Sequence, residues 1–410
     1  MLLLNIHQLL QIRTALVRRV AGKEMAELPL IRDAYLLVED GRIADFGPMS
    51  YAPTDYPGET LDCTGRLVLP AWVDSHTHLV YAGDRSGEWV DRLRGKTYAE
   101  IATAGGGILN SARRLNATPE DALYEQSKAR LDTLIRMGTA TVEIKSGYGL
   151  TLEGELKMLR VIRRLRETSL ATVRATFLGA HAVPAEYTQD REGYLRLLTE
   201  EMLPAIAAEG LADFVDVFCE EGYFSVEDTV RIVEAAAKHG LPAKLHVNQF
   251  TALGGVRAAV EHGALSVDHL EVLTDDDIAA LQSGRTTPVA LPGCSFFLGI
   301  PYTPGRRLIE AGLPLAIATD YNPGSAPSGS MHLAVSLACT QMKLLPAEAI
   351  NAATFNAAAA LGVEWDTGSI TVGKRADLIV TKPLPDFAAI PYHFGMPLVE
   401  RVILNGTIVK

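Results

Sequence analysis

Short apolar runs alternate with segments of helix length from about residue 67 to residue 362. Amphipathic stretches such as residues 153–167 and 226–239 separate runs that have the length and composition of buried strands. Eight such runs are present, at residues 68–74, 139–145, 173–178, 214–219, 243–247, 265–269, 288–291 and 315–319. Alternating strands and helices are typical of a parallel sheet, and eight repeats close into a barrel. The middle of the chain therefore predicts an α/β fold, a (β/α)8 TIM barrel.

The two ends of the chain have a different pattern. Residues 34–43 read as strands around the turn signal Asp40-Gly41, and the tail contains strand-like runs with a second turn signal at Asn405-Gly406. We expect the ends to pair into one small β-sandwich domain. The chain then divides into residues 1–65, a barrel over residues 66–364, and residues 365–410.

Charge and composition limit the kinds of partner. Lysine and arginine number 38 against 49 acidic residues, a net charge of −11, and no basic block is present. This balance argues against nucleic acid or an anionic membrane and favours a small-molecule ligand. No apolar run approaches the length needed to cross a bilayer, and the start lacks a basic leader, so we expect a cytoplasmic protein. The four cysteines are widely scattered, which disfavours disulfides and a thiolate zinc site.

Histidines fall at the ends of the expected strands. The stretch VDSHTH follows the first run, and the positions that stand at strand ends are His76, His78, His181, His246, His269 and Asp320. Catalytic residues of such barrels gather at the carboxyl ends of the strands. We therefore expect these side chains to meet in one site.

Four of these residues have the composition of a metal site. His76 and His78 project from the same strand face, and His246 and Asp320 end the fifth and eighth strands. Three imidazoles and one carboxylate suit zinc or iron, with a position left for water. Such an ion lowers the pKa of bound water toward neutrality and supplies hydroxide for hydrolysis.

These motifs resemble the amidohydrolase superfamily. The resemblance rests on residues 73–78 (VDSHTH), on His246, His269 and Thr319-Asp320, and on residues 368–378 (GSITVGKRADL) in the tail. It implies the barrel and the small β-sandwich. Relatives with two ions use a carboxylated lysine, usually from the fourth strand, and residues 214–219 contain none. One divalent ion is therefore implied, with Lys145 as a structural cation near the site.

Longer segments resemble one branch of that superfamily. They are residues 78–85 (HLVYAGDR), 104–108 (AGGGI), 145–150 (KSGYGL), 179–181 (GAH), 218–220 (FCE) and 319–325 (TDYNPGS). The branch opens the ring of 4-imidazolone-5-propanoate to N-formimidoyl-L-glutamate, the third step of histidine degradation. The same activity and substrate are implied for this chain.

The resemblance also implies roles for single residues. Arg85 holds the propionate of the substrate through paired hydrogen bonds. Tyr148 and His181 contact the ring. His269 stabilises the charge that develops on the attacked carbonyl oxygen. Asp320 holds the metal and moves the proton of the attacking water toward the departing nitrogen.

Further substrate contacts are implied at Gln249, Asn322, Gly324 and Ser325. Gln249 stands where relatives carry glutamate or glutamine, and it cannot act as a general acid, although its amide can bind the ring. Outside this context, the letters Asn-Pro-Gly-Ser also spell a plain β-turn. The glycines at residues 105–107 are expected to let a loop cover the pocket.

Three questions stay open at this level. Another deaminase or cyclic-amide hydrolase of the superfamily would use the same metal site, and an inactive barrel could serve as a binding subunit. Three histidines and one aspartate accept zinc or iron. A homodimer is expected because dimers are common among such barrels.

Overall fold

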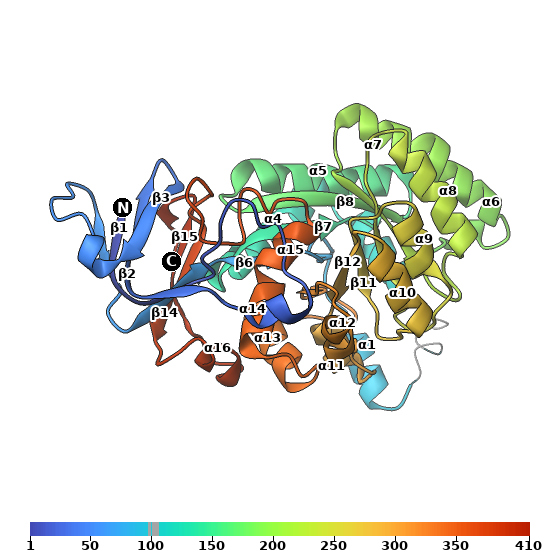
Figure 1. Ribbon diagram of the computed structural model, residues 1–410. Helices are drawn as coiled ribbons and strands as arrows, with labels where there is room; N and C mark the ends of the chain where they lie inside the picture. Colours follow the sequence, from blue (N-terminus) through green and yellow to red (C-terminus); the bar gives the residue numbers. More distant parts are fainter. Residues whose placement is uncertain (97–99, 101–105) are drawn as a thin grey trace.

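The computed structural model describes residues 1–96, 100 and 106–410. It has two parts, a barrel and a smaller β domain that contains both termini (Figure 1). Gly105, the first glycine of the expected covering loop, lies outside the described residues.

The barrel contains eight strands, each of which overlaps one of the eight expected runs. All of its paired strands are parallel, and they lie in the order of the sequence. They are β6 (Trp72–Asp74), β7 (Thr139–Lys145), β8 (Thr172–Ala180), β9 (Phe214–Cys219), β10 (Lys244–Val247), β11 (Ser266–His269), β12 (Thr287–Ala290) and β13 (Ala316–Ile317). The residues after β6 and β13 close the ring, because Asp320 N donates to His76 O at 3.0 Å and His78 N donates to Tyr321 O at 2.9 Å.

Helices surround the barrel strands (Figure 1). They are α1 (Ser86–Leu93), α3 (Ile108–Ala117), α4 (Glu120–Arg136), α5 (Leu152–Thr168), α6 (Arg191–Arg196), the π-helical η4 (Leu197–Met202), α7 (Leu203–Glu209), α8 (Val226–Ala237), α9 (Gly255–Glu261), α10 (Asp275–Ser283), α11 (Pro292–Leu298), α12 (Gly305–Glu310), α13 (Met331–Thr340), α14 (Pro346–Ala353) and α15 (Phe355–Ala360). Ser225 caps α8 with a capping box, and α8 ends two residues before the expected limit, at a turn with Gly240 in the left-handed region.

The small domain is one mixed sheet that curls around its own core. Its strands are β1 (Leu2–Leu10), β2 (Leu30–Glu39), β3 (Arg42–Pro48), β4 (Thr60–Asp62), β5 (Arg66–Pro70), β14 (Leu378–Pro383), β15 (Val399–Leu404) and β16 (Thr407–Ile408). The remaining short elements are η1 (Gly22–Ala26), η2 (Met49–Tyr51), η3 (Ala185–Tyr187) and α16 (Ala389–Tyr392). Ile43 in β3, at one end of the strand order, and Ile403 in β15, next to the other end, pack in the same core cluster. Both ends of the chain therefore build this domain, as expected.

The first expected strand is divided between the two parts, which corrects the single strand at residues 68–74. β5 pairs with β14 of the small sheet, and β6 pairs with β7 of the barrel. Val68 packs in the core of the small domain, whereas Val73 packs in the barrel. Both residues are fully buried. Hydropathy could not separate the two strands because it reports burial and not the core that a residue joins.

Within the described part of the chain, no helix combines the length and the apolar character needed to span a bilayer.

Candidate active site

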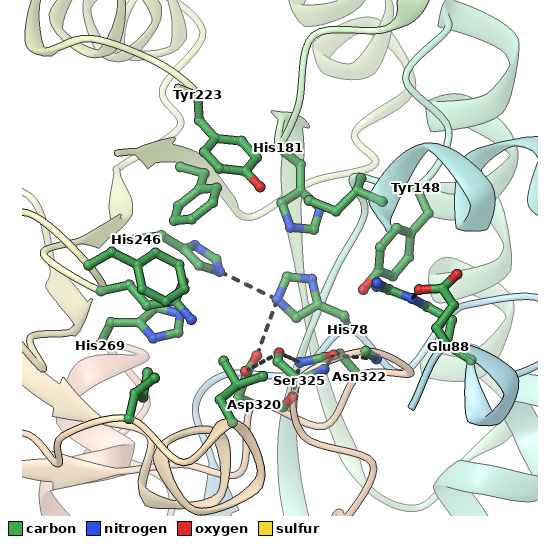
Figure 2. A pocket seen from close by; sticks show the side chains of 18 of the residues that line it. His78, Glu88, Tyr148, His181, Tyr223, His246, His269, Asp320, Asn322 and Ser325 are labelled. Carbon is green, nitrogen blue, oxygen red and sulfur yellow. Dashed lines mark hydrogen bonds and ion pairs between the residues drawn. The ribbon is translucent and has the colours of Figure 1, made fainter. Parts of the chain in front are cut away.

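A cavity of about 510 Å³ opens at the carboxyl ends of the barrel strands. Every site residue expected from the sequence lines it except His76, which is fully buried next to it. Figure 2 shows His78, His181, His246, His269 and Asp320 facing one another across this space. The structure thus brings together residues that are up to 244 positions apart, from His76 to Asp320.

Three histidines form the centre of the site. One ring nitrogen of each of His76, His78 and His246 lies within 4.8 Å of the others. Asp320 Oδ1 lies 3.6 Å from His76 Nε2 and 3.5 Å from His78 Nε2. The four expected metal ligands are therefore close enough to share one ion.

The donor set fits a divalent cation. His76 Nε2 is buried and has no hydrogen-bond partner among the described residues. Burial, with a contribution from Lys145, holds the pKa of His76 and that of His246 well below the ordinary value, so that both rings are neutral. Neutral imidazole is the form that binds metal. A cation would satisfy a nitrogen that the protein leaves unpaired.

Carboxylates orient two of these rings. Asp268 Oδ2 lies 2.6 Å from His76 Nδ1, and Asp216 Oδ2 lies 2.8 Å from His246 Nδ1. In a neutral ring, Nδ1–H donates to the carboxylate and Nε2 keeps its lone pair. The two aspartates therefore fix the tautomer that a metal site requires.

Lys145 lies behind both aspartates. Its Nζ is 2.8 Å from Asp216 Oδ2, 2.9 Å from Glu143 Oε1 and 3.9 Å from Asp268 Oδ2, with no exposed side-chain surface. Burial alone would lower the pKa of Lys145, but these carboxylates raise it, so the ammonium stays charged. Lys145 thus has the place of a structural cation near the site. The roles of Asp216, Asp268 and Glu143 could not be predicted from the sequence.

His269 is held by a carboxylate as well. Its Nδ1 lies 3.2 Å from Glu271 Oε1, and both residues are buried. His269 and Leu270 have positive φ angles of 88° and 64°, so the chain reverses at the end of β11. Burial lowers the pKa of His269, but the Glu271 carboxylate outweighs it and raises that pKa. Sequence reasoning missed Glu271, although it stands two residues after a strand-end histidine.

His181 stacks on a metal-site histidine. Its ring centroid lies 5.1 Å from that of His78 at an interplanar angle of 17°. Burial lowers the pKa of His181 to about 4, so its ring is neutral near pH 7. Nδ1 lies 3.0 Å from Gly147 O. Nδ1–H therefore donates to that carbonyl, and Nε2 is the acceptor of the ring.

Arg85 lies at the cavity wall with a fixed orientation. Its Nε donates to Glu88 Oε2 at 2.7 Å, and Glu88 also accepts from Gly107 N at 3.1 Å and from Asn110 Nδ2 at 2.8 Å. A Cβ on Gly324 would lie 2.2 Å from Arg85 Nη1. The guanidinium can therefore occupy this position only because residue 324 is a glycine.

The loop after β13 uses its polar groups internally. Asn322 Nδ2 donates to Asp320 O at 2.7 Å and to Ser325 Oγ at 2.8 Å, while Asn322 Oδ1 accepts from the backbone of Gly324 and of Ser325. Ser325 Oγ donates to Asp320 Oδ2 at 3.2 Å. The loop therefore orients Asp320. Gln249, across the cavity, donates to Cys294 Sγ at 3.4 Å.

Comparisons with known proteins identify the family of this chain. Residues 67–409 match the model of the amidohydrolase family. The imidazolonepropionase of Flavobacterium johnsoniae is 56% identical over 408 residues, covering 100% of this chain and 99% of the relative. That of Geobacillus kaustophilus is 44% identical over 392 residues, covering 94% and 92%.

Solved structures share the fold at low identity. The guanine deaminase of E. coli superposes with a TM-score of 0.76 at 16% identity, covering 100% of this chain and 98% of that one. The 5-methylcytosine deaminase of Klebsiella pneumoniae gives 0.73 at 16% identity, covering 98% of each chain. At this identity the likeness establishes the fold alone.

Proposed function

The chain belongs to the amidohydrolase family and, within it, to the imidazolonepropionases, and on this basis we propose how its cavity binds and opens 4-imidazolone-5-propanoate. It is a metal-dependent hydrolase of cyclic-amide C–N bonds, and the product is N-formimidoyl-L-glutamate. The observation that carries the proposal is the convergence of three neutral histidines and Asp320 on a cavity that also contains an arginine.

The substrate enters with its propionate toward Arg85. The guanidinium binds this carboxylate with parallel hydrogen bonds, and Glu88 fixes its plane through Nε. Tyr148 and His181 line the same cavity and contact the imidazolone ring, with His181 Nε2 as an acceptor. Gly324 and Ser325 complete the wall beside Arg85, and Asn322 holds that loop in shape.

The ring carbonyl then faces the histidine cluster. A divalent ion held by His76, His78, His246 and Asp320 would supply Lewis acidity that makes a water molecule nucleophilic near neutral pH. His269, whose pKa the Glu271 carboxylate raises, donates toward the carbonyl oxygen as negative charge develops there. Gln249 hydrogen-bonds the ring amide and carries no proton for the leaving nitrogen.

Asp320 moves the proton in this reaction. Burial raises the pKa of Asp320 above that of an ordinary carboxyl group, which makes its carboxylate a stronger base. It takes the proton of the attacking water and passes it to the departing ring nitrogen. Ser325 and Asn322 hold Asp320 in place during both steps.

We propose one ion, zinc or iron. β9 supplies Asp216 toward His246 and no lysine to bridge two ions, and nitrogen-rich sets of this kind accept either metal. The domain division into residues 1–65, 66–364 and 365–410 is also proposed, with β5, at the start of the middle segment, still paired in the small sheet. A cytoplasmic location is also proposed, supported by unpaired cysteines at four scattered positions. A homodimer completes the proposal.

The alternative activities would use the same metal site with different substrates. A deaminase or another cyclic-amide hydrolase would not require Arg85 to bind a substrate carboxylate. An inactive barrel would not require all four metal ligands. Relatives that are 42–56% identical are named imidazolonepropionase, which supports the assignment.

The test is an assay of freshly prepared 4-imidazolone-5-propanoate. Loss of its ultraviolet absorbance is followed, and N-formimidoyl-L-glutamate is identified, before and after chelation and again after zinc or iron is restored. Turnover that disappears on chelation and returns with metal supports both substrate and ion. Protein that holds metal and leaves the substrate intact would refute the assigned substrate.

A further inference from the structure

A second group of potential metal ligands lies next to the histidine cluster. One ligating atom from each of His269, Glu271 and Cys294 falls within 4.8 Å of the others. All three residues are buried, with exposed fractions of 2%, 6% and 0%. None of them belongs to the group formed by His76, His78 and His246.

The fold builds this group from two barrel segments. The reversal at His269 and Leu270 turns Glu271 back beside the His269 ring, so that Oε1 lies 3.2 Å from Nδ1. Cys294 comes from the first turn of α11, which follows β12. Thr303 Oγ1 donates to His269 O at 2.6 Å and holds the reversal. The three ligands are therefore preorganised.

One oxygen in this group is unsatisfied. Glu271 Oε2 is buried and has no hydrogen-bond partner among the described residues, and Glu271 Oε1 accepts from Ser295 Oγ only at 3.3 Å. The Cys294 sulfur accepts from Gln249 Nε2 at 3.4 Å. A buried carboxylate oxygen without a partner costs free energy, and a cation would remove that cost.

We propose that His269, Glu271 and Cys294 form a second, inhibitory site for a thiophilic divalent cation such as zinc. Imidazole nitrogen, carboxylate oxygen and thiolate sulfur are the three ligand types that zinc accepts in tetrahedral sites. The fourth position is left for water. Binding forms bonds to the sulfur and to His269 Nδ1. The Cys294 thiol proton leaves to water, and the Nδ1 proton leaves to water from a charged ring or moves to Nε2 in a neutral one.

The cation reaches this site from the substrate cavity. His269 and Gln249 line that cavity, and Gln249 contacts Cys294. A cation bound to His269 Nδ1 replaces the hydrogen bond between this nitrogen and Glu271. The ring can then no longer be protonated at both nitrogens. The expected inhibition therefore depends on the proposed role of His269 in catalysis, whereas binding of the cation to the three ligands does not.

Cadmium reports the site directly, because a cadmium–thiolate bond absorbs in the ultraviolet by charge transfer and the first site contains no sulfur. The enzyme, loaded with its own metal, is titrated with Cd²⁺ while absorbance is followed. We expect a band that saturates at one equivalent in the wild type and is absent in Cys294→Ala. Cys219→Ala removes another buried cysteine and is expected to keep the band.

A second variant tests the carboxylate. Glu271→Gln keeps the thiol and the shape of the side chain, and it should weaken Cd²⁺ binding by roughly 10-fold or more. Excess zinc should inhibit turnover in the wild type and leave Cys294→Ala active. A band that persists in Cys294→Ala, or no band in the wild type at excess Cd²⁺, would overturn the site. A band without zinc inhibition would keep the site and refute the role of His269.

Discussion

Lys145 Nζ lies 2.8 Å from Asp216 Oδ2, the same oxygen that lies 2.8 Å from His246 Nδ1. One ammonium group thus acts on a metal-site histidine through a carboxylate. Lys145 also lies 3.9 Å from Asp268 Oδ2, which orients His76. The geometry of two of the three histidines therefore depends on a residue that is out of reach of any substrate.

Replacing Lys145 tests this dependence. Lys145→Met removes the closest cation of Glu143 and Asp216, and one of the two lysines near Asp268. Breaking a buried pair costs about 3–5 kcal/mol of stability. Metal affinity should fall roughly 10- to 100-fold because the ligand orientation is lost. Thermal unfolding and competition with a chelator measure the two effects.

Lys128→Met is the matched control. Lys128 pairs with Asp132 at 2.7 Å on the surface, with 40% of its side chain exposed. The same substitution there should change stability by less than about 1 kcal/mol and leave metal affinity unchanged. Equal losses in both variants would show that Lys145 has no special role.

Arg85→Ala tests how the carboxylate of the substrate is held. Loss of charge-assisted hydrogen bonds worth about 1.5–3 kcal/mol should lower kcat/KM by roughly 10- to 100-fold, chiefly through KM. An amide analogue of the substrate should lose less between wild type and variant. If kcat/KM for the acid is intact in Arg85→Ala, Arg85 does not bind the propionate.

Gly324→Ala tests the approach of Arg85 to the loop. The added Cβ would meet Arg85 Nη1 at 2.2 Å, so the guanidinium must move away. The side chain is flexible, and we expect a raised KM with a nearly unchanged unfolding temperature. Gly87→Ala, where an added Cβ meets no atom within 4 Å, should keep KM. A Gly324→Ala enzyme with the wild-type KM would contradict this account.

The lowered pKa of His181 predicts that the stability of the folded protein depends on pH. This pKa is about 4 in the folded protein against an ordinary value of 6.5. Below pH 6.5 the unfolded chain binds a proton that folded His181 does not, so stability falls as the pH drops from 6.5 to 4. The shift corresponds to about 3 kcal/mol. In His181→Gln, urea unfolding between pH 7 and pH 4 should show a shallower decline, and parallel curves would contradict this.

The barrel could be predicted because its strands are continuous apolar runs separated by amphipathic helices. The assignment of β5 to the small sheet could not be predicted, because Val68 and Val73 are equally buried but pack in different cores. Hydropathy also could not give the ends of β6 and β13. Just after these strands, backbone hydrogen bonds around His76 and Asp320 close the ring.

The convergence of the expected metal ligands could be predicted because histidines at strand ends are conspicuous. Their carboxylate partners could not, because the pairing of His76 with Asp268 crosses 192 positions and depends on barrel closure. Asp268 and Asp216 read as ordinary strand residues. The place of Cys294 beside His269 and Glu271 could not be predicted either, since these two residues come from another segment of the barrel.

The central claim is that one divalent ion, held by His76, His78, His246 and Asp320, is required for opening of the imidazolone ring. The most direct measurement is turnover of 4-imidazolone-5-propanoate during titration of the metal-free protein with zinc or iron. We expect activity to rise from the baseline to a maximum at one equivalent. Full activity without metal, or a maximum reached only at two equivalents, would contradict the account.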